Sequence, residues 1–447
     1  MTQAEFDPRA GLTQQQLDAH WMPSTGNRQF KRDPRLIVKA QGNYYFTADG
    51  RRIFDGLSGL WTCGAGHARP EIADAVSQQL RTLDYSPAFQ FGHPKSFQLA
   101  ERITRLMPDE LNRIFFTGSG SESADTALKI ARAYWRKRGM GHKTRLIGRV
   151  KGYHGVNFGG ISVGGLAPNR ALFGSAVEAD HLPHTLLPEN RFVKGMPEHG
   201  SHLAEQLLEI IALQDASTIA AVIVEPMAGS AGVLPPPQGY LARLRAICDE
   251  HDILLIFDEV ITAFGRLGAN TGAEAFGVTP DILTMAKQLT NGAIPMGAVA
   301  VRQSIYDTFM ENGGPDYALE LPHGYTYSAH PVSCAASLAT LDILEQEQLI
   351  ERSASIAPIL ESAVHSLADK PWVSDIRNCG LAAGLTIESM PGEPLRRPFE
   401  IAMRLWDKGF YVRYGGDTLQ LGLPFTCQQA EIDSLIAAME DSLQQQN

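Results

Sequence analysis

The chain has 447 residues, of which 44% are hydrophobic and 20% are charged, and its formal net charge is −10. A soluble chain of this length exceeds the usual size of one domain, so we expect two domains. Nucleic acids and acidic membrane surfaces bind clustered basic residues, and the sequence contains no such cluster, which excludes both as partners.

The sequence predicts a cytoplasmic protein. Its N-terminus has no basic start followed by an apolar run, and no uncharged apolar stretch is long enough to span a bilayer. The five cysteines are scattered and odd in number, so they predict neither a disulfide framework nor a zinc site. We expect reduced thiols at Cys63, Cys248, Cys334, Cys379 and Cys427.

The first 60 or so residues predict a loosely structured arm and a small β element. Short runs at 44–46 and 52–54 flank Asp49-Gly50, a dipeptide typical of hairpin turns. From about residue 68, helical periodicity alternates with short apolar runs at 114–116, 145–147, 220–224, 253–257, 282–285 and 298–301. This alternation predicts an α/β fold with a mostly parallel sheet covered by helices on both faces.

Two later stretches have a different pattern. Residues 155–200 are rich in Gly, Pro and His, which predicts loops over a site. After about residue 330 the pattern predicts a second, α+β domain. Its helices are expected at 332–347, 350–367, 399–408 and 430–442, and its strands at 373–376 and 383–387.

A glycine turn at Gly118 to Ser121 follows the apolar run at 114–116 and precedes a strongly helical segment. Free backbone N–H groups at such a helix start, together with the helix dipole, form a site for a phosphate dianion. The hydroxyls of Ser119 and Ser121 add donors, and Gly120 allows close backbone approach. Taken alone, the pattern fits an ordinary helix cap equally well.

A carboxylate and an amine each stand at the end of an apolar run, at Asp258 and Lys287, which lie 287 − 258 = 29 positions apart. The carboxyl ends of parallel strands form the ligand-binding edge of a sheet. Pyridoxal phosphate needs a lysine to hold its aldehyde as a Schiff base and an acid to keep its ring nitrogen protonated. Taken singly, Asp258 fits a cap and Lys287 a solvated charge, but their order after the phosphate loop favours the cofactor site.

The segment Gly152 to Gly155 supplies an aromatic ring and an imidazole between glycines. We expect Tyr153 to stack on the cofactor ring and Val260 to pack against the opposite face. His154 is interpreted as a structural, hydrogen-bonded histidine at the cofactor site, with no proton transfer assigned. A metal site at His181 and His184 is rejected, since Pro183 interrupts the pair and no acidic partner is nearby.

These blocks, in this order, resemble the class III, ω-amino-group-transferring, pyridoxal-phosphate aminotransferases of fold type I. Within that family the resemblance is closest to bacterial enzymes that use pyruvate and ω-amino acids such as β-alanine. The match runs from about residue 35 to 445. It rests on Leu60-Trp61, Gly118 to Glu122, Tyr153 to Gly155, Val224-Glu225-Pro226, Asp258-Glu259-Val260, Ala286-Lys287, His323 to Tyr327 and Val412-Arg413.

The resemblance implies a seven-stranded, mostly parallel large domain at 68–330 and a smaller α+β domain. The smaller domain is expected to combine 1–67, which includes the N-terminal arm, with 331–447. It also implies a homodimer, possibly paired into a tetramer, with active sites at the subunit interface. The small-molecule partners it implies are an amine and an oxo acid.

Further site residues are implied by the same resemblance. Arg413 would hold the substrate carboxylate bidentately, while Trp61 would line the substrate pocket. Thr326 of one chain would reach the cofactor phosphate of the other, and Phe89 or Phe91 would wall the pocket from the partner. The corresponding positions place Glu225 and Ile261 at the cofactor and Ala231 at the substrate.

Three positions depart from the family pattern, and two of them narrow the expected substrate. Relatives that act on 4-aminobutyrate carry an arginine where this chain has Val156, and a glutamate where it has Ser230. Many members also have a glutamine that contacts the cofactor's phenolic oxygen, where this chain has Ile261. With one cation in the pocket, a substrate with two carboxylates would be poorly compensated, so we expect pyruvate as the acceptor.

The sequence leaves other functions open. Fold and cofactor do not fix the reaction, so a 4-aminobutyrate aminotransferase, an aminomutase or a decarboxylase on the same scaffold remains an alternative. From a different class, a protein that binds a nucleotide or another phosphorylated metabolite without pyridoxal phosphate would also use the loop at Gly118 to Ser121.

Overall fold

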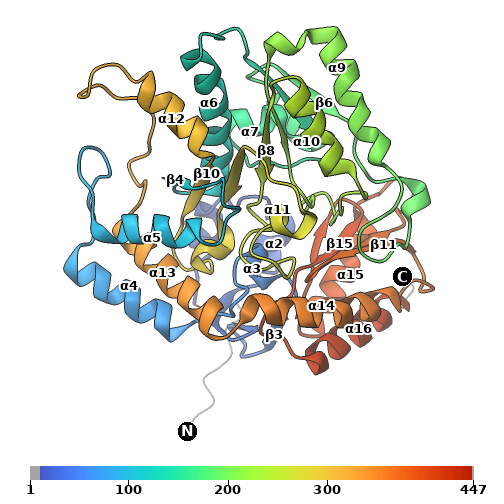
Figure 1. Ribbon diagram of the computed structural model, residues 1–447. Helices are drawn as coiled ribbons and strands as arrows, with labels where there is room; N and C mark the ends of the chain where they lie inside the picture. The colour runs from blue at the N-terminus through green and yellow to red at the C-terminus, as the bar shows by residue number, and fades with distance from the viewer. Residues whose placement is uncertain (1–10, 445–447) are drawn as a thin grey trace.

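The computed structural model describes residues 11–444, and a seven-stranded sheet forms its centre (Figure 1). The strand order is β4-β10-β9-β8-β7-β5-β6, in which β10 is antiparallel to both neighbours and the other pairs are parallel. The bounds are β4 Arg113–Thr117, β5 Arg145–Arg149, β6 Ala179–Leu182, β7 Ile219–Val224, β8 Leu254–Asp258, β9 Ile282–Met285 and β10 Gly297–Val301. The predicted mostly parallel α/β sheet is therefore confirmed.

Alternate residues of the central strand β7 enter two separate apolar cores. Val222 and Val224 pack in one core with α10 residues such as Leu244, whereas Ala221 and Ile223 pack in the other, which contains residues of α6. Because side chains alternate across a strand, these two cores lie on opposite faces of the sheet. Burial on both faces explains why the predicted strands read as continuous apolar runs.

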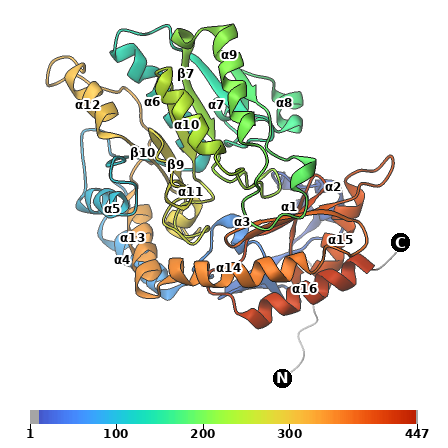
Figure 2. The same cartoon turned by 45° about the vertical axis from the view of Figure 1, so that its right-hand side comes forward.

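Helices cover the sheet and extend below it (Figures 1 and 2). They are α4 Pro70–Thr82, α5 Pro94–Thr104, α6 Gly120–Lys137, α7 Phe158–Val163, α8 Ala167–Phe173, α9 Gln206–Gln214, α10 Tyr240–Glu250, α11 Gly272–Phe276, α12 Gln303–Glu311 and α13 Pro331–Gln346. Short 3-10 turns are η1 Pro188–Asn190, η2 Ser201–Glu205, η3 Ala216–Thr218 and η4 Lys287–Thr290. None of the helices within residues 11–444 combines the length and apolar character needed to cross a membrane.

Two smaller sheets contain the N-terminal and C-terminal parts of the chain. The first has the order β1-β2-β3-β13, with β1 Ile37–Gln41, β2 Tyr44–Thr47, β3 Arg52–Asp55 and β13 Phe410–Tyr411. The second has the order β11-β12-β15-β14, with β11 Val373–Cys379, β12 Ala382–Ile387, β14 Arg413–Gly415 and β15 Thr418–Leu421. Because β13 pairs with β3, a segment from the N-terminal part of the chain and one from its C-terminal part share one sheet.

The remaining helices are α1 Gln14–Ala19, α2 Asn27–Arg32, α3 Ser58–Trp61, α14 Leu349–His365, α15 Arg396–Asp407 and α16 Gln429–Gln444. The helices expected after residue 330 and the hairpin at Asp49-Gly50 are confirmed, and Gly50 adopts the left-handed φ of +80° that the turn requires. The expectation of loops alone at 155–200 is wrong, since α7, α8 and β6 lie there. As an edge strand that includes Asp180 and His181, β6 lacks the apolar run that marks a buried strand.

Candidate active site

The predicted site residues lie at one edge of the seven-stranded sheet. Asp258 is the last residue of β8, and its backbone is level with Thr284 of the neighbouring strand β9. Lys287 follows β9 by two residues, at the start of η4. The other segments leave the sheet at the same edge because their strands run in the same direction: Gly118 follows β4, Tyr153 follows β5 and Glu225 follows β7.

The carboxylate of Asp258 is buried and held from three sides. The Thr284 hydroxyl donates to Oδ1 at 3.1 Å, the Val260 backbone N–H donates to Oδ1 at 3.2 Å, and His154 Nδ1 lies 2.8 Å from Oδ2. These contacts fix the orientation of the carboxylate. The predicted hydrogen-bonded histidine is confirmed, and its partner is the site carboxylate itself.

Lys287 occupies a left-handed backbone position, with φ of +48°, and keeps partial solvent exposure deep in the protein. Burial lowers the pKa of its amine to about 8. Asp258 and Glu225 raise this pKa, whereas Arg413 and Arg266 lower it. At pH 7 roughly a tenth of the amines are therefore neutral and able to attack a carbonyl carbon.

The start of α6 forms an anion cradle. Ser119 is the N-cap, and its side chain accepts a hydrogen bond from the Glu122 N–H at 3.2 Å. The next two N–H groups, of Gly120 and Ser121, make no hydrogen bond within residues 11–444. Two free donors at the start of an 18-residue helix suit a phosphate dianion.

Close backbone approach shapes the space beside this cradle. A Cβ at Gly120 would lie 2.9 Å from Val260, and one at Gly155, where φ is +87°, would lie 2.4 Å from the Ser121 hydroxyl. Glycine is therefore required at both positions. The free N–H donors, the buried carboxylate and the amine of lowered pKa together fit the phosphate, the ring nitrogen and the aldehyde of pyridoxal phosphate.

Glu225 joins two loops of the site. Its carboxylate accepts hydrogen bonds from the Tyr153 N–H at 2.9 Å and the Gly229 N–H at 3.0 Å. Burial raises the pKa of this carboxyl, and burial also raises the pKa of the Tyr153 phenol. Glu225 thus fixes the aromatic segment relative to the turn at 229–233, which contains Ala231.

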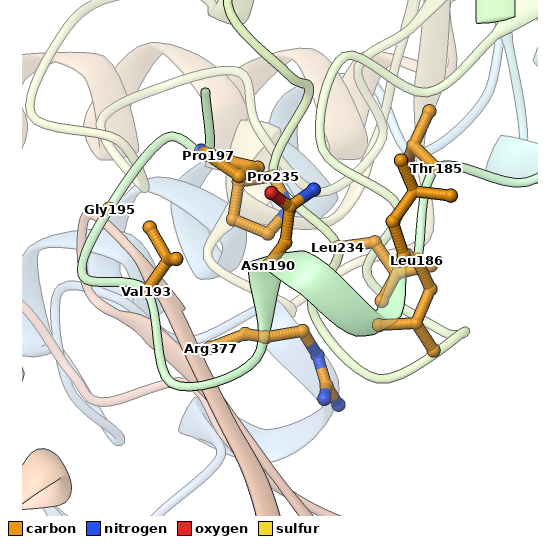
Figure 3. A pocket seen from close by; sticks show the side chains of 10 residues that line it. Thr185, Leu186, Asn190, Val193, Gly195, Pro197, Leu234, Pro235 and Arg377 are labelled. Atoms are coloured by element: carbon orange, nitrogen blue, oxygen red, sulfur yellow. The ribbon is translucent and has the colours of Figure 1, made fainter. Parts of the chain in front are cut away.

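The turn at 229–233 also contacts the sheet formed by β11, β12, β14 and β15. Arg377 donates to the Gly232 carbonyl at 2.9 Å, and Gln420 donates to the Ser230 carbonyl at 3.2 Å. Ile261 packs against the turn, since a Cβ at Gly229 would lie 2.4 Å from its Cδ1. Figure 3 shows a cavity beside Arg377, and none of the predicted site residues lines it.

Trp61 and Arg413 come from outside the seven-stranded sheet. Trp61 is only 2% exposed and belongs to an apolar cluster with Val233 and Ile261. Arg413 stands at the start of β14, partly buried, and no carboxylate of residues 11–444 forms an ion pair with it. Its charge acts on both Lys287 and Tyr153, so this guanidinium is available to a substrate carboxylate near the amine.

Phe89 and Thr326 lie together on the molecular surface. The Phe89 ring is 52% exposed and packs beside Gly324, where a Cβ would lie 2.7 Å from the ring. The carbonyl of Thr326 accepts a hydrogen bond from the Tyr85 hydroxyl at 3.0 Å. Within the described chain, no hydrogen bond joins either residue to Asp258 or Lys287.

The sequence reasoning missed two residues that contact the site. Thr284 bonds the Asp258 carboxylate, and strand register was the signal that could have identified it. Arg266 is buried beside Trp61, and no simple motif marks it. Within the described part of the chain all five cysteines are free, and no group of three or more His, Cys, Asp or Glu residues could hold a metal ion.

Comparison with known proteins places this geometry in one family. The aminotransferase class-III profile matches residues 25–443. The chain is 60% identical to a β-alanine–pyruvate aminotransferase of Pseudomonas aeruginosa and 58% identical to an ω-amino acid–pyruvate aminotransferase of Pseudomonas putida, in both cases over 96% of each chain. An amine transaminase from an uncultivated Pseudomonas species, solved with pyridoxal phosphate bound, matches with a TM-score of 0.87 at 38% identity, covering 95% of this chain and 98% of that one. The chain therefore belongs to the class-III aminotransferases and is a pyridoxal-phosphate-dependent aminotransferase.

Proposed function

We propose that the enzyme transfers an amino group from β-alanine or a related ω-amino acid or amine to pyruvate. The observation that carries the substrate assignment is the charge of two predicted substrate-binding positions: Arg413 has no ion-pair partner in residues 11–444, and Val156 supplies no charge where a second carboxylate would need one. The names of the two relatives at 60% and 58% identity support the same substrates.

Two residues carry the chemistry. Bound pyridoxal phosphate supplies a reactive aldehyde and a ring that accepts electrons from the substrate carbon. Lys287 would hold the cofactor through its amine, and the same amine would take up the proton of the substrate carbon. The carboxylate of Asp258, fixed by Thr284 and His154, would pair with the protonated ring nitrogen.

Other residues would bind the cofactor and orient its ring. The N–H groups of Gly120 and Ser121, with the cap residue Ser119, bind the phosphate. Tyr153 and Val260 would pack on opposite faces of the ring. Glu225 fixes the Tyr153 segment through its hydrogen bond from the Tyr153 N–H, and His154 fixes the Asp258 carboxylate. Ile261 would pack at the ring edge in place of the usual polar contact.

The substrate would be held between the large domain and the small domain. Arg413 binds its carboxylate with two parallel hydrogen bonds. Trp61 and Ala231 wall the pocket and limit the size of the substrate. In this proposal the large domain spans 68–330, and the small domain combines 1–67 with 331–447; residues 1–10 and 445–447 lie outside the described residues.

The enzyme is proposed to act as a cytoplasmic homodimer that shares its active sites, and such dimers can pair into tetramers. Large side chains are exposed in the segments that contain Phe89 and Thr326: Phe89 at 52%, Phe91 at 70% and Tyr327 at 65%. Exposed aromatic side chains clustered on a surface are typical of protein interfaces. Thr326 would then reach the partner's phosphate, and Phe89 the partner's substrate pocket.

The test compares pyruvate and 2-oxoglutarate as acceptors with β-alanine as the fixed donor. Pyruvate should have a kcat/KM about a hundredfold higher, because a second carboxylate would lose roughly 2 to 3 kcal/mol of hydration without a partner. Arg413→Ala should lower the pyruvate value and affect an amine without a carboxylate much less. Arg105→Ala, at a side chain 67% exposed on the surface, is the control.

A gain-of-function variant completes this test. Val156→Arg restores a cation at the position where 4-aminobutyrate enzymes have one, and it should raise the use of 2-oxoglutarate relative to pyruvate. The substrate proposal is wrong if the kcat/KM of the parent enzyme for 2-oxoglutarate equals or exceeds its kcat/KM for pyruvate.

A further inference from the structure

The turn that carries Trp61 has a strained backbone. Within Ser58–Trp61, the residues Ser58, Gly59 and Trp61 have φ values of +46°, +69° and +67°. Left-handed φ is unfavourable for serine and tryptophan, and it persists only where the surroundings hold the residue in place. The contacts around this turn therefore decide where the indole ring lies.

Arg266 makes one side-chain hydrogen bond to this turn, in addition to those made by Asp55 and by the Gly422 carbonyl. It is 1% exposed, and its Nη2 donates to the Ser58 hydroxyl at 3.1 Å. Its Nη1 donates to the Leu423 carbonyl at 2.5 Å and to the Leu381 carbonyl at 3.2 Å. One guanidinium thus connects the Trp61 turn to two segments of the C-terminal part of the chain.

The same guanidinium packs on the indole. Its central carbon lies 5.6 Å from the Trp61 ring centroid and 4.8 Å from that of Phe425, within the range of cation–π contacts. Gly422 also abuts the indole, since a Cβ at that position would lie 2.4 Å from the Trp61 ring. Arg266 and Gly422 together leave the ring one position.

The charge of Arg266 has no ion-pair partner among residues 11–444. Burial lowers its pKa to about 10, against the opposing effects of Cys427, Asp55 and Cys63, so it remains protonated at neutral pH. The Asp55 carboxylate has other partners: it lies 2.7 Å from His67 Nε2 and accepts hydrogen bonds from the Leu57 and Gly59 N–H groups. A buried, unpaired positive charge is costly, which suggests that it is retained for a purpose.

The Trp61 turn is connected to the lysine of the site. The segment that follows it donates from the Gly64 N–H to the Gln288 side chain at 2.7 Å and from the Ala65 N–H to Asn291 at 3.0 Å. Gln288 is the residue next to Lys287.

We propose that Arg266 is a positioning and specificity-determining residue. Its guanidinium, bonded to Ser58 and packed on the indole, holds Trp61 as a wall of the substrate pocket. This inference rests on the role proposed above for Trp61. Arg266 itself is not a catalytic residue, since it acts on the substrate through Trp61.

The inference is tested with the purified holoenzyme by comparing kcat/KM for a bulky amine and for β-alanine. Arg266→Met removes the guanidinium donors at similar length and should change the ratio of the two values several-fold. Arg266→Lys keeps a cation against the indole and should move the ratio back toward that of the parent. Arg352→Met is the matched control and should keep the parent's ratio, since Arg352 also donates to backbone carbonyls of this segment, at Phe425 and Cys427.

Gly422→Ala tests the position of the indole independently, because it pushes on the ring and leaves Arg266 in place. It should change the same kcat/KM ratio of a bulky amine to β-alanine. If Arg266→Met does not fold, Arg266→Gln gives a neutral variant that can still donate to one carbonyl.

The results distinguish this inference from the proposed function. A folded neutral variant at Arg266 that keeps the amine preference of the parent overturns the inference. The proposed role of Lys287 fails instead if a Lys287→Ala protein still forms a borohydride-trappable link to the cofactor. A changed preference in Arg266→Met that Arg266→Lys moves back toward the parent's supports the inference.

Discussion

The two halves of the candidate site differ in how completely one chain builds them. At the sheet edge, the Asp258 carboxylate is bonded by Thr284, His154 and the Val260 backbone, and Glu225 joins two loops within the same chain. At the other half, Phe89 is 52% exposed and Thr326 lies on the surface. The first half is packed and hydrogen-bonded, whereas the second presents apolar surface to solvent.

This difference means that the reacting groups lie in the buried half, whereas the exposed half serves to close the pocket. The buried half fixes a carboxylate and an amine with a lowered pKa, and both depend on burial within one chain. The exposed half has the character of an interface and contributes to a site only when something covers it. Changes in the buried half should therefore affect turnover most, and changes in the exposed half should depend on the state of association.

The largest effect is expected for Lys287→Ala, which removes the amine of the buried half. Transaminase activity should fall by at least about a thousandfold, because both the covalent hold on the cofactor and the proton transfer are lost. Single-turnover and steady-state rates measure this loss. Lys129→Ala, an exposed lysine on α6, should keep full activity. Substantial activity in Lys287→Ala would mean that another residue carries the chemistry.

Asp258→Asn should have the next largest effect. An ion pair at near-contact distance is worth roughly 4 kcal/mol at an intermediate effective dielectric, and desolvation offsets part of it, so we expect about a hundredfold loss in kcat. Glu259→Gln is the matched control: Glu259 is equally buried, but it caps α11 through the Gly272 and Ala273 N–H groups. That variant should lose stability and keep its turnover per folded molecule. Equal turnover losses in the two variants would contradict the ring-nitrogen role of Asp258.

A smaller effect is expected of pH on the rate at which Lys287 binds the cofactor covalently. The pKa of Lys287 is lowered from 10.5 to about 8, and the protonated amine cannot attack an aldehyde. Covalent uptake of cofactor by the cofactor-free protein should therefore rise about tenfold per pH unit below this value and level off above it. Stopped-flow absorbance between pH 6 and 9.5 would follow the reaction. A rate still rising steeply at the upper end would indicate an amine with an ordinary pKa.

Much of the fold could be predicted from local pattern. The strands buried on both faces, such as β7 and β8, appear as continuous apolar runs, and the glycine turn before α6 marks its start. Strand β6 was missed because an edge strand with Asp180 and His181 has no such run. The antiparallel direction of β10 was also not predictable, since an apolar run does not encode direction.

The site residues also differ in whether the sequence alone could predict them. Asp258 and Lys287 could be identified because both follow apolar strands in sequence order. Thr284 and Arg266 could not, since their contacts with Asp258 and Trp61 depend on strand register and on packing between distant segments. Ordinary residue types at unremarkable spacings gain their meaning only from the tertiary structure.

Subunit mixing tests the comparison between the two halves most directly. Lys287→Ala destroys the buried half, and Thr326→Glu places a negative charge where the partner's phosphate is expected to bind. Mixed under conditions of confirmed subunit exchange, half of the dimers become hybrids, each with one intact site, so about a quarter of the parental activity should return. If no activity returns although hybrids form, each chain builds its own site and the shared-site account is wrong.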